Sequence, residues 1–318
     1  MKKEIITLLH FNRLPSITGR GWGWVFLLML LTACYHDKHE FTPNEFDGKP
    51  VGYVAPQLLW EDPADAAAVG SINALSFQVQ GSNGVSRARS FTSIEESADW
   101  LQQLPAGDYD ILVTADMDEP SGYVLTTTGT PAENMLTPTS VSLRDAASSP
   151  RQSWYAVTHV TIREDEITVA EFKLQRLLPT LYLTISNMPE GYSIRAQVEH
   201  AAQNVLLTSQ NEAGRYGVPS AEEQTVDFGV MPADGTTFSL TKRFMPTASS
   251  QERTVIHLYL VTPQGIDQDC TIDAPRMLTG QYYKLSLTYD DLHPYIYIKS
   301  SDVNDWEVGS TINGGQAM

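Results

Sequence analysis

Cysteine is almost absent from this sequence, which holds only Cys34 and Cys270 among its 318 residues. Two cysteines cannot supply a disulfide framework or a zinc site built from several thiolates. The fold must therefore be stabilised by its hydrophobic core rather than by cross-links. Cys270 lies in the strand-like run Asp269–Ile272, so we predict that its thiol is buried and unreactive.

Basic residues are also scarce, since 21 Lys and Arg stand against 38 Asp and Glu and give a formal net charge of −17. An acidic protein repels phosphate backbones and anionic lipid headgroups. This balance argues against nucleic acid as a partner and against attachment to a membrane through a basic patch. Any attachment to a membrane needs another kind of anchor.

The common catalytic motifs are missing: the sequence contains no Gly-x-Ser-x-Gly, no phosphate-binding Gly-x-x-x-x-Gly-Lys-Ser/Thr and no His-Glu-x-x-His. His36 and His39 lie close together and could bind a metal weakly, or they could simply be solvated linker residues. His257 lies in an apolar run and is predicted to be a hydrogen-bonded core residue rather than a ligand. We therefore predict neither an enzyme nor a cofactor site.

Two acidic runs concentrate carboxylates, which are potential ligands for a cation. Asp116-Met117-Asp118-Glu119 could contribute to a calcium site, because calcium prefers oxygen ligands, but the run lacks the spacing of an EF-hand loop. Glu164-Asp165-Glu166 lies between two strand patterns and is predicted to be a solvated hairpin turn. We predict no metal site.

The N-terminal segment has the features of a secretory signal. Its apolar run Trp22–Leu31 has ten residues, whereas a helix that spans a bilayer needs about 20. The residues before it are basic: Lys2, Lys3, Arg13 and Arg20. A basic region, an apolar region and a small-residue cleavage site define a signal peptide, here residues 1–33.

The end of this segment, Leu31-Thr32-Ala33-Cys34, also resembles the lipobox of bacterial lipoproteins. That resemblance implies cleavage after Ala33 and acylation of Cys34, which would then have no thiol to offer Cys270. The alternative is an ordinary secretory signal with a cysteine nearby by chance. Residues 34–50 are polar and without periodicity, so they are predicted to be a flexible tether between lipid and folded body.

Beyond Pro56 the sequence is dominated by short runs that alternate apolar and polar residues, the pattern of half-buried strands. Thr254–Val261 is apolar on both faces apart from His257, so it is predicted to be a central strand. One segment differs: Thr92–Leu104 has helical spacing, with Ser93 and Glu96 as a possible capping box. The whole pattern predicts an all-β protein with one short helix.

A weak internal repeat suggests two units. Leu104-Pro105-Ala106-Gly107-Asp108-Tyr109 leads into one predicted strand, and Met188-Pro189-Glu190-Gly191-Tyr192 leads into another. In each, Pro and Gly would form a tight turn and Tyr would cover the end of a core. We predict an N-terminal β-sandwich over residues 51–178 and a C-terminal one over residues 179–318.

Several of these features together resemble one family. They are the lipobox with its short charged tether, the Leu104–Tyr109 turn, Phe172–Arg176 leading into Leu181–Ser186, and a C-terminal pattern made of Gly280–Leu287, Tyr295–Ile298 and Asp305-Trp306. The chain is similar to the fimbrial anchor, tip and accessory lipoproteins of Bacteroidetes, the fimbrillin-like relatives of the major and minor fimbrium anchors. The resemblance implies two tandem transthyretin-like (Greek-key) β-sandwich domains and lipid anchoring to the outer membrane. It also implies docking to fimbrial subunits by strand complementation.

The sequence departs from the family pattern at one place. Lys299-Ser300-Ser301-Asp302 separates Ile298 from Val303, where the family runs its last strand directly into the tryptophan. This departure leaves the register of the terminal strand open.

A second function stays open beside the fimbrial one. Four tryptophans could form a stacking platform for sugar rings, as in glycan-binding surface lipoproteins, or could belong to the core: Trp60, Trp100, Trp154 and Trp306. The sequence thus predicts a lipid-anchored cell-envelope protein, an anchor or accessory subunit of a fimbria-like surface assembly, with glycan binding as the alternative. It would be anchored in the outer membrane, on either its outer or its periplasmic side.

Overall fold

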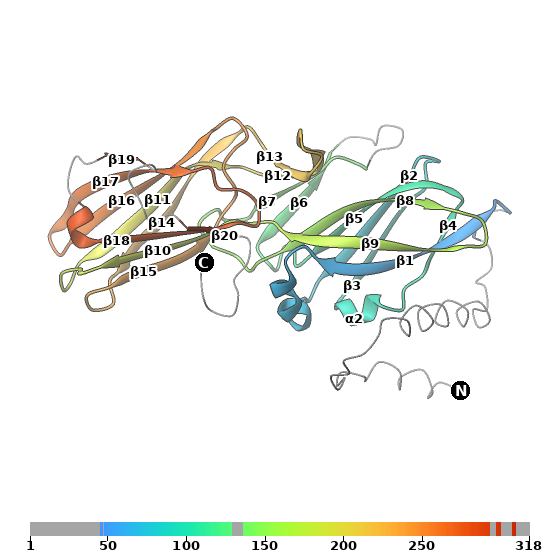
Figure 1. The fold of residues 1–318 in the computed structure, drawn as a ribbon, viewed down its shortest axis with the longest axis horizontal. Coiled ribbons are helices and arrows are strands. Elements are labelled where there is room, and N and C mark those ends of the chain that lie inside the picture. The colour runs from blue at the N-terminus through green and yellow to red at the C-terminus, as the bar shows by residue number, and fades with distance from the viewer. Residues whose placement is uncertain (1–44, 47, 129–135, 293–296, 300–306, 310–318) are drawn as a thin grey trace, which may run out of the picture. The chain divides into compact units, whose positions relative to one another are not determined.

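The computed structural model describes residues 45–46, 48–128, 136–292, 297–299 and 307–309 (Figure 1). The predicted signal peptide, Cys34 and nearly all of the tether, with His36 and His39, lie outside these residues. Among the described residues, no helix has the length and apolar character needed to cross a membrane.

The first group of strands forms one seven-stranded sheet in the order β3-β2-β5-β8-β9-β1-β4. Its strands are β1 (Val51–Trp60), β2 (Leu75–Gly81), β3 (Ser86–Phe91), β4 (Gln102–Pro105), β5 (Gly107–Ala115), β8 (Trp154–Ile162) and β9 (Ile167–Arg176). Most neighbours are antiparallel, but β1 and β9 run parallel from Tyr53↔Ile167 to Trp60↔Leu174. The sheet folds over at β8 and β9, which are paired only at Trp154↔Arg176 and Tyr155↔Gln175.

The second group forms two sheets, ordered β15-β10-β18-β20 and β14-β11-β16-β17-β19. Its strands are β10 (Thr180–Ser186), β11 (Ser193–Ala202), β14 (Glu223–Pro232), β15 (Phe238–Arg243), β16 (Arg253–Thr262), β17 (Gly265–Pro275), β18 (Tyr282–Thr288), β19 (Tyr297–Lys299) and β20 (Glu307–Gly309). Here β10 and β18 run parallel, as do β17 and the short β19. The apolar strand β16 lies between β11 and β17, as its sequence predicted.

The two groups repeat one topology. The order β4-β1-β9 corresponds to β15-β10-β18, and the order β3-β2-β5-β8 corresponds to β14-β11-β16-β17. In both, the first strand lies between a short antiparallel strand and a parallel strand from later in its group, β9 or β18. This confirms the predicted all-β, tandem transthyretin-like sandwich architecture.

The sequence repeat that suggested two units does not mark equivalent positions. The turn before Tyr109 leads into β5, whereas the turn before Tyr192 leads into β11. In the shared topology β5 corresponds to β16 and β11 corresponds to β2. The two groups are therefore structural repeats, but the two similar turns lie at non-equivalent places and do not arise from the repeat. Tyr109 does cover the end of its core, since it is 1% exposed and its hydroxyl donates to the Pro105 carbonyl at 2.8 Å.

Each group encloses its own hydrophobic core, built by the alternation seen in the sequence. In β2 the side chains of Leu75, Phe77 and Val79 are buried and the residues between them are partly exposed. In β16 the same holds for Ile256, Leu258 and Leu260. Burying one such side chain stabilises the fold by about 1.5–3 kcal/mol, so these rows are the main support of a chain without cross-links.

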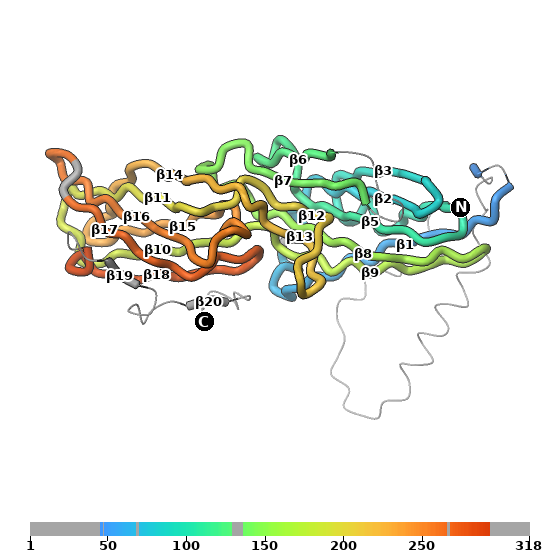
Figure 2. Tube along the Cα trace, turned by 90° about the horizontal axis from the view of Figure 1, so that it is seen from above, coloured from blue at the N-terminus to red at the C-terminus, as the bar shows by residue number. Residues whose placement is uncertain are grey.

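A third sheet, which the sequence did not predict, joins the two groups (Figure 2). It has the order β13-β12-β7-β6, from β6 (Tyr123–Thr127), β7 (Thr139–Leu143), β12 (Val205–Gln210) and β13 (Tyr216–Pro219). In sequence, β7 lies between β5 and β8 of the first group and β12 between β11 and β14 of the second, and the two pair at Val141↔Val205 and Ser140↔Leu206. The described residues from Phe46 onward form one compact unit. The division into domains at residues 178 and 179 therefore stays a proposal.

The prediction of a helix over Thr92–Leu104 is mostly wrong. Helix α2 covers only Ile94–Ser97, and Gln102–Pro105 forms β4 instead. Leu104 is fully buried as a strand residue opposite Gly52 of β1, and pairing with that strand outweighs the helical spacing. The capping prediction is half right: the Ser93 hydroxyl accepts from the Glu96 backbone, but the Glu96 carboxylate accepts from Thr92 rather than from Ser93. A nine-residue 3-10 helix, η2 (Pro63–Ser71), was not predicted.

Candidate functional site

The two sandwiches differ at one pair of equivalent strands, which is β8 and β9 in the first and β17 and β18 in the second. In the first, a tight turn joins β8 to β9, with Asp165 at a φ of +57° and its amide donating to the Val51 carbonyl at 2.9 Å. The Thr158 hydroxyl then bridges to the Glu171 carbonyl at 2.8 Å, and the Thr168 hydroxyl to the Thr161 carbonyl at 3.3 Å. These contacts close this side of the first sandwich. The exposed turn Glu164–Glu166 confirms the predicted hairpin.

In the second sandwich the corresponding strands stay apart. Across the described ranges, β17 and β18 share no ladder, and each accepts a different short strand of the C-terminal segment. Strand β19 pairs in parallel with β17 from Thr271↔Tyr297 to Asp273↔Lys299. Strand β20 pairs antiparallel with β18 from Tyr282↔Gly309 to Lys284↔Glu307. We call β17 and β18, Gly265–Pro275 and Tyr282–Thr288, the open edge.

The open edge is backed by a packed core and a fixed loop. Ile272 and Ala274 of β17 and Tyr283 and Leu285 of β18 are all buried. The Tyr283 hydroxyl donates to the Arg276 carbonyl and accepts from the Leu278 amide, both at 2.9 Å. Burial raises the pKa of Tyr283, so the phenol stays protonated and able to donate. The core behind the edge is therefore built from residues of β17 and β18 themselves.

The outer strand β3 of the first sandwich carries charges that protect it from unwanted pairing. Arg89 lies opposite Phe77 and Arg87 lies opposite Val79, so both arginines share the face that points to the core. Residues directly opposite in an antiparallel pair lie on the same face, and inward-pointing charges prevent another strand from adding there. Strand β4 is short and ends in Pro105, which also discourages pairing. This contrast favours the open edge as the place for strand addition.

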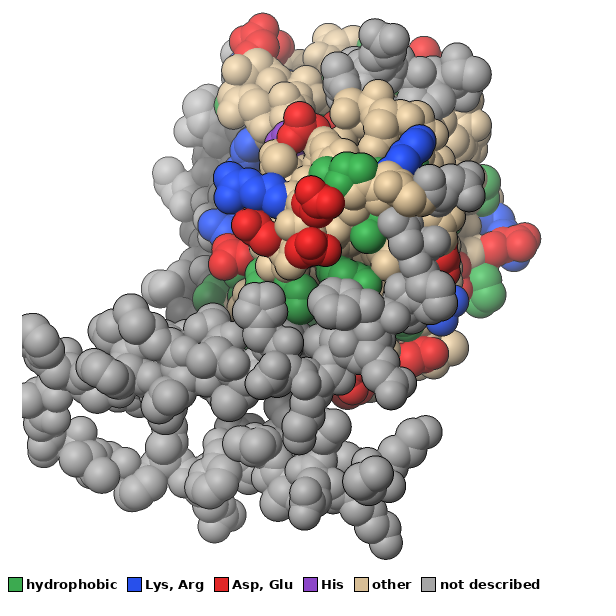
Figure 3. Space-filling model, turned by 90° about the vertical axis from the view of Figure 1, so that its right-hand side faces the viewer, with side chains coloured by type: hydrophobic (Ala, Val, Ile, Leu, Met, Phe, Trp, Pro, Cys, Tyr) green, Lys and Arg blue, Asp and Glu red, His purple; other side chains and the backbone are tan. Residues whose placement is uncertain are grey.

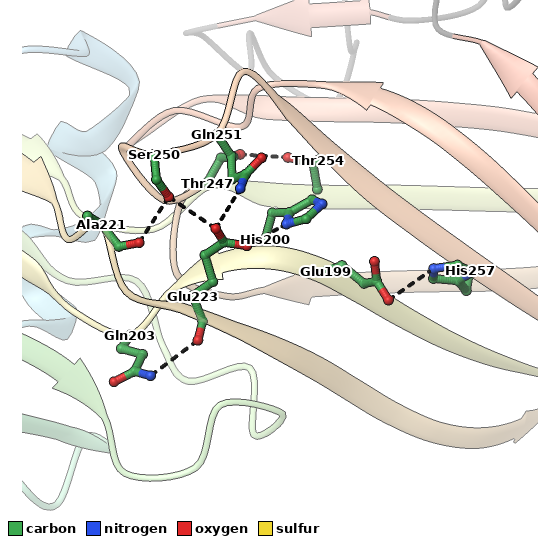
Figure 4. Close-up of polar contacts among 10 residues, drawn as sticks. All are labelled: Glu199, His200, Gln203, Ala221, Glu223, Thr247, Ser250, Gln251, Thr254 and His257. Atoms are coloured by element: carbon green, nitrogen blue, oxygen red, sulfur yellow. Dashed lines mark hydrogen bonds and ion pairs between the residues drawn. The ribbon is translucent and has the colours of Figure 1, made fainter.

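A polar network on the second sandwich contains serine, histidine and glutamate side chains (Figure 4). His200 Nδ1 lies 2.6 Å from Glu223 Oε2, and the Ser250 hydroxyl donates to the Ala221 carbonyl at 2.9 Å and to Glu223 Oε1 at 3.1 Å. The contact to His200 and that to Gln251 hold the pKa of the Glu223 carboxyl below its usual value. A nucleophilic serine must donate to a histidine that acts as base. Here the carboxylate stands between them, so the network braces the β-bulge where His200 has a φ of +63°.

His257 was predicted to be a core residue and is not. Its neighbours Ile256 and Leu258 face the core, so His257 lies on the outer face of the sheet with its side chain 18% exposed. It is hydrogen-bonded as expected, 3.2 Å from the Thr271 hydroxyl, and 3.3 Å from Glu199 (Figure 4). The apolar run hid the period of two, because both faces of this strand carry apolar residues.

The acidic run Asp116–Glu119 does not gather its carboxylates. Asp116 Oδ1 accepts from the amides of Asn73 and Ala74 at 2.8 and 3.1 Å, Asp118 accepts from the Ser121 amide, and Glu119 pairs with Arg144. Burial raises the pKa of Asp116 above its usual value. Within the described part of the chain, no group of three or more potential metal-binding side chains is present.

The tryptophans that the structure describes pack in or against the first core. Trp154 is 4% exposed and lies 5.5 Å from the partly buried Trp60, edge to face, and the partly buried Trp100 packs against Phe77 and Phe91. These rings contact the core rather than form an exposed sugar platform, and Trp306 lies outside the described residues. Cys270 is buried as predicted, and burial raises its pKa to about 11. Cys34 cannot be placed, since it also lies outside these residues.

The sequence matches a family of bacterial fimbrial proteins, and the structure is similar to solved structures of Bacteroides proteins. A model of the family of fimbrillin-A associated anchor proteins Mfa1 and Mfa2 matches residues 62–312. A candidate adhesin of Bacteroides ovatus has a TM-score of 0.51 at 15% identity, covering 82% of this chain and 96% of that one. A candidate polysaccharide-binding protein of Bacteroides thetaiotaomicron has a TM-score of 0.50 at 12% identity, covering 83% and 100%.

The fimbrial anchor protein Mfa2 from Porphyromonas gingivalis has a TM-score of 0.47 at 12% identity, covering 74% of this chain and 90% of that one. No curated protein sequence matches the chain. The two Bacteroides structures show a shared fold.

Proposed function

Because the chain belongs to the family of fimbrillin-A associated anchor proteins Mfa1 and Mfa2, we propose that a lipid on Cys34 holds it in the outer membrane and that the open edge receives a strand of a fimbrial subunit. Its place in the family makes it a structural protein of the cell envelope, an anchor or accessory component of a fimbrial assembly. The pairing of two extra strands at the open edge is the observation that carries the docking part of this proposal.

The tether sets how far the folded body stands from the membrane. Arg87 lies 5.2 Å from the centre of the Phe46 ring, so the folded body begins at Phe46. Twelve residues from Cys34 to Phe46 reach at most about 40 Å when fully extended. Several acyl chains on Cys34 would anchor the protein stably, whereas one chain binds only marginally.

The end of the body nearest the tether supports attachment through lipid rather than through charge. Acidic and basic side chains are mixed on this end, around a group of hydrophobic ones (Figure 3). The turn there carries Glu164, Asp165 and Glu166 against Arg163, which lies 3.8 Å from Glu166. Such an end has no excess of basic charge with which to bind anionic headgroups.

The open edge is suited to exchange because its present strands are short. Three residue pairs hold β19 and three hold β20. A longer strand from a neighbouring subunit would form more backbone hydrogen bonds with β17 or β18 and would displace them, which is β-strand addition. The protein itself has no catalytic part in this proposal.

The experiment is a truncation that ends the chain after Leu292 and so removes β19 and β20. Tagged full-length and truncated proteins are captured from cells, and co-purified fimbrial subunits are quantified. If fimbrial subunits add a strand at the open edge, the amount of subunit captured should differ between the two proteins, because the truncation removes the strands that cover this edge. A truncated protein that folds and captures the same subunits in the same amounts would sink this docking site.

Lipid attachment is tested separately with Cys34→Ala. We expect the variant to leave the membrane fraction and the full-length protein to remain in it. A variant that stays membrane-bound to the same extent contradicts the assignment of Cys34. Glycan binding remains a second candidate function, favoured by one cleft of the molecule.

A further inference from the structure

A polar cleft of about 480 Å³ lies beside the first turn of η2. Its walls come from four places: the end of β1 with the start of η2, the end of β9, the turn between β12 and β13, and the loop between β17 and β18. The volume falls within the range of about 300–1,000 Å³ typical of small-molecule sites. No part of the proposed lipid anchor or strand docking uses this cleft.

Every charged side chain that lines the cleft already has an ion-pair partner, although three carboxylates stand against two guanidinium groups. Arg176 donates through Nε and Nη2 to Asp65 Oδ1 at 2.9 and 2.7 Å, and Arg215 donates to Glu61 at 2.6 Å. Asp65 Oδ2 is occupied by the Trp154 indole N–H at 2.9 Å. An ionic ligand would therefore have to break an existing pair before it could gain one. A neutral ligand has no such cost.

Asp62 leaves one buried oxygen unused at the cleft wall. Its side chain is 10% exposed, and Oδ1 accepts from the Ala64 amide at 2.9 Å. Oδ2 lies 3.2 Å from Arg176 Nη2 as an ion-pair contact, but no described group donates a hydrogen bond to it. A buried acceptor without a donor costs about 1–3 kcal/mol, more when charged, which a suitable ligand would recover.

The neighbouring polar groups offer both donors and acceptors. Gln175 and Gln281 supply amides, and Thr279 supplies a hydroxyl. The loop is held close, since a side chain at Gly280 would lie 3.2 Å from the Arg176 carbonyl and Gly280 has a φ of +72°. A ligand with adjacent hydroxyl groups can donate to Asp62 Oδ2 with one and accept from an amide or guanidinium with the next.

We propose that this cleft binds a neutral carbohydrate, with Asp62 as the acceptor that orients a sugar hydroxyl. The proposal is independent of the fimbrial role. It does not use the tryptophan rings, because the described ones pack in or against the first core. Since the cleft lining in the described residues offers no aromatic ring for stacking, affinity would come from hydrogen bonds and be modest.

The test uses the full chain, extracted from membranes in detergent, on an array of neutral oligosaccharides. Two variants alter the cleft: Asp62→Asn keeps the Oδ1 acceptor for Ala64 but replaces the other oxygen with a donor, and Thr279→Trp fills the space. Asp99→Asn, at an exposed site elsewhere, is the matched control. We expect at least tenfold weaker binding for both cleft variants and no change for the control, with thermal unfolding checked for all three.

Three results would overturn the proposal. They are the absence of any bound oligosaccharide, equal binding by wild type and both cleft variants, and competition by an oligolysine peptide as strong as that by the sugar. The last would mark the cleft as a site for a cationic side chain. Capture of fimbrial subunits by Asp62→Asn is measured in parallel and should match wild type, so failure of one proposal is separable from failure of the other.

Discussion

Arg176 and Asp65 are joined by two hydrogen bonds, from Nε at 2.9 Å and from Nη2 at 2.7 Å, both to Asp65 Oδ1. Their side chains are only 15% and 7% exposed. This pair ties the last residue of β9 to the first turns of η2, a helix that the sequence did not reveal. Because the other Asp65 oxygen accepts from Trp154, the carboxylate also fixes an aromatic residue of the core.

Replacing Asp65 with alanine should lower the free energy of unfolding by about 3–5 kcal/mol, because the buried Arg176 loses both hydrogen bonds to Asp65 and keeps only the ion-pair contact with Asp62 at 3.2 Å. Urea unfolding followed by tryptophan fluorescence measures this change. Glu61→Ala is the control, since Glu61 and Arg215 form an exposed pair with side chains 48% and 62% exposed. Loss of that pair should cost under about 1 kcal/mol. Equal losses in the two variants would contradict the structural role given to Asp65.

Gly217→Ala should lower the free energy of unfolding by about 2–5 kcal/mol. Gly217 has a φ of +88°, and an added Cβ would lie 1.7 Å from the Tyr155 hydroxyl oxygen, so strain and a steric clash act together. Gly214→Ala is the control, because Gly214 has a similar φ of +74° with nothing within 4 Å of its Cβ. The double variant Gly217→Ala, Tyr155→Phe should recover part of the loss. A loss no larger than that of Gly214→Ala would show that no clash occurs.

The stability of the protein should fall below about pH 4 through Asp227. Hydrogen bonds from Arg195 hold the pKa of Asp227 well below its usual value of about 3.9. A carboxyl group whose pKa is depressed on folding stabilises the fold at pH above its unfolded pKa, and this contribution is lost as pH falls toward the folded pKa. Thermal midpoints between pH 2 and pH 7 should therefore depend less on pH in Asp227→Asn than in wild type or Asp99→Asn. Identical pH profiles would refute this role.

Thiol labelling reports on both cysteines at once. Burial raises the pKa of Cys270 to about 11, so at pH 8 roughly one thiol in a thousand is ionised, and the side chain is shielded as well. If Cys34 is acylated, the native protein extracted from membranes should react with no thiol reagent on a scale of minutes. One thiol should react after denaturation. Rapid labelling of one thiol in the native state would show that Cys34 is free.

The sequence predicted the strands well where one face of a strand is buried and the other is not. Leu75, Phe77 and Val79 alternate because β2 has a core on one side only. The helix beyond Ser97 failed because residues 102–105 gain more by pairing with β1 than by continuing a helix. The spacing of apolar residues within one segment carries no information about a partner strand about fifty residues away in the sequence.

The third sheet and the open edge were beyond the reach of sequence patterns. Strands β7 and β12 are short, and they pair across more than sixty residues of sequence at Val141↔Val205. The open edge exists because β17 and β18 do not pair with each other, and the sequence of either strand does not reveal which neighbour it lacks. The cleft was missed for a similar reason, because Asp62, Arg176 and Gln281 come together only through the fold.

The third sheet has a mechanical consequence for a component of a fimbrial assembly. The chain passes from β9 to β10 through Leu177, Leu178 and Pro179 alone, and a single strand of backbone would act as a hinge. Leu177 and Leu178 are instead buried with Tyr155, Val205 and Met245 in the core beneath the third sheet. A load carried from one sandwich to the other is shared between the backbone, the β7–β12 ladder and this core, so the link resists bending.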